Sequence, residues 1–322
     1  MQTNTFTPAF GLSNCHLQTL YSTFFRKNIK LNLSNEIFTL SDDDFLEYSW
    51  CNKPTNSTTP IVLLLHGLEG SINSPYIRGM MKTLEENNIS SVLMHFRGCG
   101  TKDNKKANSY HSGQTSDVKE FIEYIKNIYK ENDLYCIGYS MGGNILLKLL
   151  GEYKDNSPIK KAVSISAPIL LDNSSKTIHK GFSRIYEKHL LKNLIIHLGK
   201  KYLKHDMEKI IGIKKKDIKN IKSIWEFDDV YTAKVNGFKT ASNYYKLSSS
   251  KQYLKDIKTK TLIIHALDDP FMTKEILPLK KDIPSNITLC LSKNGGHVGF
   301  IGGTIINPIY WLEKEIVSFF KN

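Results

Sequence analysis

The chain has 322 residues, of which 40% are hydrophobic and 23% are charged, so it is long enough for one large globular domain with a buried core. Its formal net charge is +13, but only four of its 44 basic residues are arginines. Arginine is favoured for bidentate phosphate recognition, so the charge alone does not predict a nucleic-acid partner. We expect neither a membrane-spanning helix nor a signal peptide, since no run of 18 apolar residues and no basic-then-apolar start is present.

Strand-like and helix-like segments alternate along the chain. Segments 36–40 and 45–50 predict a hairpin that forms an antiparallel edge. The alternation that follows favours a mainly parallel central sheet with helices on both faces, an α/β fold. The expected strands are 61–66, 91–96, 134–137, 159–166, 261–265 and 286–291, and the expected helices are 75–88, 114–129, 141–153 and 311–320.

Residues 171–224 interrupt this alternation. Their apolar spacing predicts two or three amphipathic helices, which we interpret as a helical cap inserted into a single domain, 1–322, whose residues 1–34 form an N-terminal arm. Fourteen Lys/Arg against five Asp/Glu give the cap a charge of +9. Its basic face could contact an anionic membrane while its apolar face lines an acyl pocket. The alternative is a solvated surface on ordinary packing helices.

The five cysteines, at positions 15, 51, 99, 136 and 290, are scattered without CxxC or Cys/His spacing. This arrangement is typical of reduced thiols, and it predicts a cytoplasmic protein without a zinc site.

A serine stands between glycines at the join of a predicted strand and helix, in Gly138-Tyr139-Ser140-Met141-Gly142. Gly-x-Ser-x-Gly in this position is the pattern of a nucleophile elbow, a sharp turn that raises the serine hydroxyl above the sheet. Side chains at 138 and 142 would collide with neighbouring backbone, and Ser140 would adopt a strained conformation. The helix N-terminus that follows favours developing negative charge.

In such folds the acid and the histidine follow the serine along the chain. His297 lies in a glycine-rich loop, 294–300, after the last predicted strand. Asp268 and Asp269 both follow the preceding strand. We prefer Asp269, which directly precedes Pro270, with Asp268 as the second choice and a solvated turn acid as the alternative for either. The chosen carboxylate would orient the imidazole and stabilise the imidazolium.

A tetrahedral intermediate also needs N–H donors that face its oxyanion. We expect these from the backbone of Met141 and of Leu68, the latter in the loop 66–70. We expect His66 to brace that loop by a hydrogen bond.

These motifs resemble the α/β-hydrolase superfamily, and within it the YheT-like branch of esterases. The resemblance extends over about residues 10–315. It implies the α/β-hydrolase fold and a serine hydrolase acting on carboxylic esters. Eukaryotic relatives of this branch are membrane-anchored lipases and phospholipases. The matching segments are NCHLQTL (14–20), HGLEGS (66–71), SPY (74–76), HFRGC (95–99), YHSG (110–113), GYSMGGN (138–144), FDD (227–229), DDPF (268–271) and GGHVGF (295–300).

We therefore predict a carboxylesterase or lipase-like enzyme that cleaves small-molecule or lipid esters through Ser140, His297 and Asp269 and an acyl-enzyme, without a metal or organic cofactor. Thioesterase, amidase and acyltransferase activities remain alternatives because they use the same triad. A non-catalytic lipid- or protein-binding module is the alternative from another class, although a binder needs none of the three residues.

Four other polar residues are given structural interpretations. We expect His16, Gln18 and His111 to pack or hydrogen-bond the N-terminal arm against the body; a role in a second site is their alternative. We expect Arg97 to tie loops together through backbone carbonyls; holding a substrate carboxylate is its alternative.

Overall fold

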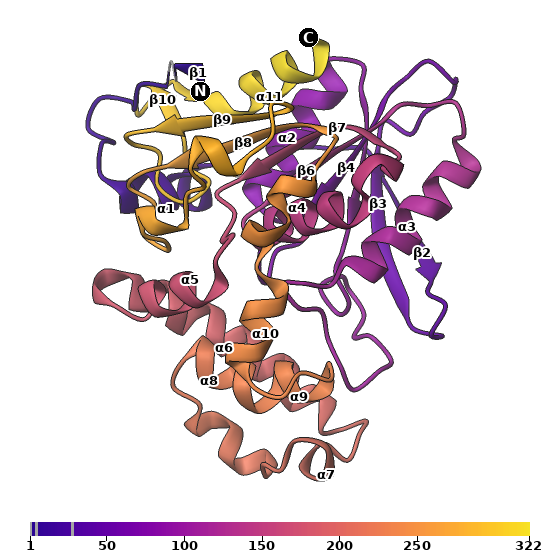
Figure 1. Cartoon of the computed structure of the whole chain (residues 1–322), viewed down its shortest axis with the longest axis vertical. Helices are drawn as coiled ribbons and strands as arrows, with labels where there is room; N and C mark the ends of the chain where they lie inside the picture. Colours follow the sequence, from indigo (N-terminus) through magenta and orange to yellow (C-terminus); the bar gives the residue numbers. More distant parts are fainter. Residues whose placement is uncertain (1, 4–5, 27–28) are drawn as a thin grey trace.

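The computed structural model describes residues 2–3, 6–26 and 29–322. Its main sheet runs in the order β1-β9-β8-β7-β6-β4-β5-β3-β2 (Figure 1). All pairings from β1 across to β5 are parallel, whereas β3 pairs antiparallel with β5 and with β2. The predicted fold class is thereby confirmed. The strands are β1 (Gln2–Thr3), β2 (Leu33–Thr39), β3 (Phe45–Cys51), β4 (Ile61–Leu65), β5 (Ser90–Met94), β6 (Leu134–Tyr139), β7 (Ile159–Ile165), β8 (Lys260–Ala266) and β9 (Ile287–Ser292).

The strand order places two loops side by side at the centre of the sheet. β4 pairs with β5 on one side and with β6 on the other, so the chain changes direction across the sheet between β5 and β6. Ligands in open α/β sheets bind at such a point, beyond the carboxyl ends of the strands. Gly67 follows β4 there and Ser140 follows β6.

Helices cover both faces because the central strands are apolar on both sides, as β4 and β5 show by being buried along their whole length. α2 (Pro75–Glu86) and α11 (Trp311–Lys321) pack on one face, and α3 (Thr115–Ile128) and α4 (Met141–Tyr153) on the other. The predicted helices are confirmed to within two residues at each end. The edge hairpin β2–β3 is also confirmed, although β2 begins three residues earlier than predicted.

Four elements were not predicted. They are β1, the helix α1 (Cys15–Phe25) in the N-terminal arm, and a small antiparallel sheet of β10 (Ile301–Gly303) and β11 (Pro308–Tyr310). β1, β10 and β11 have only two or three residues each, which is too short for a periodic pattern.

The cap is a group of helices beyond the carboxyl edge of the sheet, at the bottom of Figure 1. The helical stretch continues past the expected end at residue 224, because a separate apolar cluster joins Leu191 and Leu198 of the cap to Phe227 and Tyr231. A π-helical turn, Asp228–Thr232, lies within it. The cap helices are α5 (Leu171–Ile178), α6 (Arg184–Lys201), α7 (Met207–Ile211), α8 (Ile224–Phe227), α9 (Ala233–Val235) and α10 (Ala241–Ser248). Short 3₁₀ turns occupy Lys154–Asn156, Gly181–Ser183, Lys215–Asn220, Ser250–Asp256, Lys274–Ile276 and Lys280–Asp282.

Among the helices that the structure describes, none has the length and apolar character needed to cross a bilayer.

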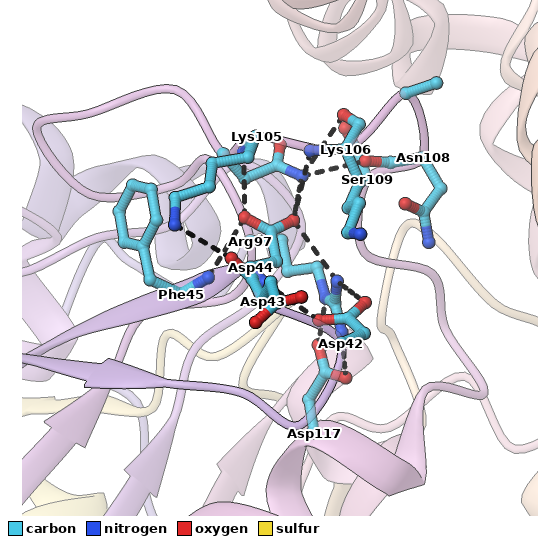
Figure 2. A network of polar contacts seen from close by, with 12 residues as sticks. Asp42, Asp43, Asp44, Phe45, Arg97, Lys105, Lys106, Asn108, Ser109 and Asp117 are labelled. Atoms are coloured by element: carbon cyan, nitrogen blue, oxygen red, sulfur yellow. Dashed lines mark hydrogen bonds and ion pairs between the residues drawn. The ribbon is translucent and has the colours of Figure 1, made fainter.

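Arg97, just beyond β5, joins the turn between β2 and β3 to helix α3 through carboxylates (Figure 2). Its guanidinium makes two hydrogen bonds to Asp117, of 2.6 and 2.8 Å, and reaches Asp42 at 2.7 Å and Asp44 at 3.2 Å. The expectation that it binds backbone carbonyls is wrong, because its partners are carboxylates, of which Asp44 and Asp117 are buried and Asp42 is exposed. All three guanidinium nitrogens donate to these carboxylates, which disfavours the alternative that Arg97 holds a substrate carboxylate.

Asp44 is held as an anion inside this cluster. Burial opposes its ionisation, but hydrogen bonds from Asn104 and from backbone N–H groups, including that of Lys105, outweigh burial and lower its pKa. A lowered folded-state pKa means that Asp44 stabilises the fold above its unfolded pKa. That contribution is lost as the pH falls through the folded-state pKa.

Replacing Arg97 tests the cluster. We expect Arg97→Ala to lower the free energy of unfolding by about 3–5 kcal/mol, because it leaves buried carboxylates without their cation. Urea denaturation at neutral pH measures this change. Lys176→Ala is the matched control, since Lys176 pairs with Asp172 at 2.6 Å on the cap surface, where such pairs contribute about 0.5 kcal/mol or less. Equal losses in the two variants would contradict the role given to Arg97.

Candidate active site

Ser140 occupies the sharp turn between β6 and α4. Its backbone φ and ψ are 51° and −119°, a conformation that few residues other than glycine adopt. Its N–H donates to the carbonyl of Ile165 at 2.8 Å, which ties the turn to β7. The flanking glycines are required by space: a Cβ on Gly138 would lie 2.5 Å from the Gly142 oxygen, and one on Gly142 would lie 2.4 Å from the Leu65 oxygen.

His297 lies against Ser140 although 157 residues separate them in the chain. Its Nε2 is 2.9 Å from the Ser140 Oγ, and its Nδ1 is 2.8 Å from the Asp269 Oδ2. The carboxylate of Asp269 is an acceptor, so Nδ1 carries the proton and the Nε2 lone pair faces the serine hydroxyl. The Asp269 side chain is fully buried, and its Oδ1 accepts the N–H of Phe271 at 2.9 Å. The structure therefore brings together the three residues chosen from the sequence.

The neighbouring acid, Asp268, has a different set of contacts. Its Oδ1 accepts the N–H of Gly296 at 2.9 Å, and its Oδ2 lies 3.5 Å from Nδ2 of Asn294. Asp268 thus shapes the loop that carries His297, whereas Asp269 contacts the imidazole itself.

Helix α1 supports the His297 loop from outside the sheet. The Thr19 Oγ1 accepts the N–H of His297 at 2.9 Å. The fully buried Gln18 donates to the carbonyls of Leu12 and Ile301 and accepts the N–H of Ile301 at 2.7 Å. Gln18 therefore holds the arm against the body, as expected. The contacts of α1 with the His297 loop could not be predicted from the sequence, because the two segments are about 280 residues apart.

The aromatic ring of Phe271 was also missed. It stacks on the His297 imidazole with 4.2 Å between ring centroids. The N–H of Val298, the next residue in the loop, donates to the Ser166 Oγ at 3.1 Å. Stacking thus holds the His297 ring, and this hydrogen bond holds the backbone beside it.

The loop after β4 approaches Ser140 closely enough to contribute an N–H donor. A Cβ on Gly67 would lie 3.3 Å from the Ser140 Cβ. Leu68 and Met141, the two expected oxyanion donors, line the same cavity as Ser140 and His297. Their assignment as donors stays a prediction.

His66 braces this loop, as expected. Its Nε2 accepts the N–H of Phe96 at 3.2 Å, so Nδ1 donates to the carbonyl of Gly67 at 2.7 Å. Burial lowers the pKa of His66 to about 3, which keeps it neutral. His111 is likewise structural, since its Nδ1 accepts the N–H of Gly113 at 3.1 Å. His16 bonds to Tyr186 at 3.2 Å and so links α1 to the cap.

Ser140 and His297 face a cavity of about 360 Å³ between the sheet and the cap. The size is within the range of small-molecule sites. Thr19 and Thr23 of α1 lie on one side of it, and the cap supplies an apolar wall. That wall includes Leu171, Ile178, Leu190 and Ile224.

Comparison with known proteins gives concordant results. Residues 60–304 match the family described as alpha/beta hydrolase fold. The chain is 38% identical over 312 residues to "Putative esterase YheT" of Escherichia coli (strain K12), covering 97% of this chain and 91% of that protein. It is 27% identical over 325 residues to Phospholipase ABHD3 of Bos taurus, covering 98% and 80%. The solved structure of the Pyrococcus furiosus esterase Pf2001 has a TM-score of 0.57 and 19% identity, covering 91% and 93% of the two chains, and this similarity concerns the fold alone.

Proposed function

The chain belongs to the α/β-hydrolase fold family, and on this premise we propose that it is a serine hydrolase that cleaves carboxylic esters through Ser140, His297 and Asp269. The observation that carries the proposal is the 2.9 Å contact between the His297 Nε2 and the Ser140 Oγ. A serine hydroxyl is a weak nucleophile until such a base accepts its proton.

The first half of the reaction forms an acyl-enzyme. The Ser140 oxygen attacks the ester carbonyl carbon while its proton passes to Nε2 of His297. The imidazolium is stabilised by the Asp269 carboxylate, which does not take the proton. The carbonyl electrons move to oxygen, where the N–H groups of Leu68 and Met141 would donate to the oxyanion. Collapse of this intermediate breaks the ester C–O bond, and Nε2 protonates the departing alcohol.

The second half repeats these steps with water. His297 accepts a proton from water as it attacks the acyl carbon, and Nε2 then returns a proton to the Ser140 oxygen as the acid leaves. The apolar cap wall suits an acyl chain, and relatives named as an esterase and a phospholipase support ester substrates. Thioesterase and acyltransferase reactions would use the same acyl-enzyme with a different leaving group or acceptor.

Peripheral contact with an anionic membrane belongs to the same proposal. On α6, Ile185 is 56% exposed and shares a face with the exposed Lys188 and Lys192, which are three and seven residues further on. Leu190 of the same helix lines the cavity. Apolar and cationic side chains together favour binding at an anionic lipid surface beside the cavity.

Labelling with a fluorophosphonate probe tests the proposed reaction. We expect the native protein to be labelled at Ser140, because His297 activates its hydroxyl, and Ser140→Ala to remain unlabelled. Mass spectrometry of the labelled peptide identifies the site, with heat-denatured protein as the negative control. A native protein that does not react would favour the non-catalytic binding module.

Substitution of the two neighbouring acids separates their roles. Asp269→Asn should reduce kcat for p-nitrophenyl acetate by about 10³–10⁴-fold, because the amide cannot hold the required histidine tautomer. Asp268→Asn should reduce kcat less than about tenfold, since an amide oxygen still accepts the N–H of Gly296. A reversed order of effects would assign the triad acid to Asp268.

Sedimentation with liposomes tests the membrane contact. The protein should bind vesicles rich in phosphatidylserine at low salt and leave them at high salt, because each basic residue near the surface contributes about 1 kcal/mol. Lys188→Glu with Lys192→Glu should abolish binding. The matched control is Lys258→Glu with Lys260→Glu, at the exposed amino end of β8 and away from the cap. Equal binding to neutral vesicles would contradict this part of the proposal.

A further inference from the structure

The cavity that contains Ser140 has an acidic side chain that ester hydrolysis does not use. Asp228, at the start of the π-helical turn, lines this cavity of about 360 Å³ and also a smaller one of about 90 Å³. Leu68 and Met141 line both cavities as well. The Asp228 carboxylate therefore belongs to the same enclosure as the expected oxyanion site.

The hydrogen-bond partners of this carboxylate are neutral hydroxyls. Tyr245 donates to its Oδ2 at 2.8 Å, and Thr232 makes a side-chain hydrogen bond to it. Within the described part of the chain, no lysine, arginine or histidine pairs with Asp228. A carboxylate accepts at about four lone-pair sites, so these two partners leave acceptor capacity unused.

Burial of this group is energetically costly. It raises the pKa of Asp228 to about 6, against the hydrogen bonds from Thr232 and Tyr245 that lower it. A buried carboxylate without a cation gains strongly from a further donor, because such bonds are stronger in low dielectric surroundings.

The adjacent acid shows what a purely structural carboxylate looks like in this segment. Asp229 lies next to Asp228, yet its Oδ1 accepts the N–H of Ala241 at 2.8 Å, at the start of α10. Asp229 is not among the residues that line either cavity. Asp228 is the first residue of the π-helical turn, a rare conformation that occurs frequently at functional sites.

From this geometry we propose that Asp228 is a specificity-determining residue, which accepts a hydrogen bond from a hydroxyl or ammonium group on the ester substrate. The inference rests on the proposed ester hydrolysis at Ser140 and names the substrate class of that site: esters with a donor group besides the reacting carbonyl. An unsubstituted alkyl ester would leave the buried carboxylate without that donor, and sites of this kind discriminate against such analogues.

Matched ester pairs test this proposal in the wild-type protein. In two pairs a hydroxyl replaces a methyl group: 2-hydroxyethyl butyrate against propyl butyrate, and ethyl 6-hydroxyhexanoate against ethyl heptanoate. In a third, 2-(dimethylamino)ethyl butyrate against 3-methylbutyl butyrate, an ammonium replaces a carbon. We expect kcat/KM to be about tenfold or more higher for the donor-bearing ester in at least one pair. The preferred pair then shows whether Asp228 binds a hydroxyl or an ammonium group, and whether that group lies on the acyl or the alcohol half of the ester.

Two variants connect the preference to the carboxylate. Asp228→Asn should reduce the ratio of kcat/KM values within the preferred pair severalfold, because a neutral amide oxygen of the same size accepts a hydrogen bond more weakly than a carboxylate. Asp229→Asn should leave that ratio unchanged. A merely structural role for Asp228 would lower kcat/KM for both esters of a pair alike and leave their ratio intact.

The outcomes separate the two proposals. If no ester is hydrolysed, the proposed function fails. If esters are hydrolysed but every wild-type ratio is near one, or if Asp228→Asn retains the preference, the inference about Asp228 is overturned while the hydrolase stands. Should Asp228→Asn not fold, a structure of the wild-type protein carrying a hydroxyalkyl phosphonate on Ser140 decides. The hydroxyl should lie about 3 Å from the Asp228 carboxylate, and a hydroxyl bound elsewhere overturns the proposal.

Discussion

The proposed chemistry depends on one contact, the 2.9 Å hydrogen bond between the His297 Nε2 and the Ser140 Oγ, and the surrounding structure positions these two residues. This hydrogen bond joins two loops at the carboxyl edge of one sheet, and it orients a lone pair toward a hydroxyl only while Asp269 holds the other imidazole nitrogen. Helix α1 fixes the His297 loop through Gln18 and Thr19. An N-terminal arm that is remote in sequence is thereby part of the support of the site.

The loops that meet at this site carry backbone strain. Ser140 has a φ of 51°, Glu69 beside the expected oxyanion donor has 56°, and Val298 beside His297 has 61°. Such conformations cost roughly 1–3 kcal/mol each and persist only where surrounding contacts enforce them. The bond from Ser140 N–H to Ile165 and that from Val298 N–H to Ser166 are among these contacts. The end of β7 and the residue that follows it thus hold the strained turns at Ser140 and Val298 in place.

Buried charge is handled in two different ways in the same molecule. Arg97 contacts three carboxylates from two segments, the turn between β2 and β3 and the helix α3, so its charge is compensated within the fold (Figure 2). Asp228 has only hydroxyl partners and borders a cavity. The first arrangement stabilises the body around the loops. The Asp228 carboxylate can accept a further hydrogen bond from a ligand, which is why we assign it to substrate selection.

The sequence by itself determined the α/β class, the long strands and helices, and the elbow at Ser140, because hydrophobic periodicity and the Gly-x-Ser-x-Gly spacing are local properties of the chain. It favoured Asp269 over Asp268 only because Asp269 precedes a proline, since both acids follow β8; the contact with His297 is a feature of the tertiary structure. It could not show that α1 supports the His297 loop, or that Asp228 borders the cavity while Asp229 caps α10. Contacts between distant segments depend on how the strands are ordered and how the cap packs. No local pattern encodes them, so only the tertiary structure decided these questions.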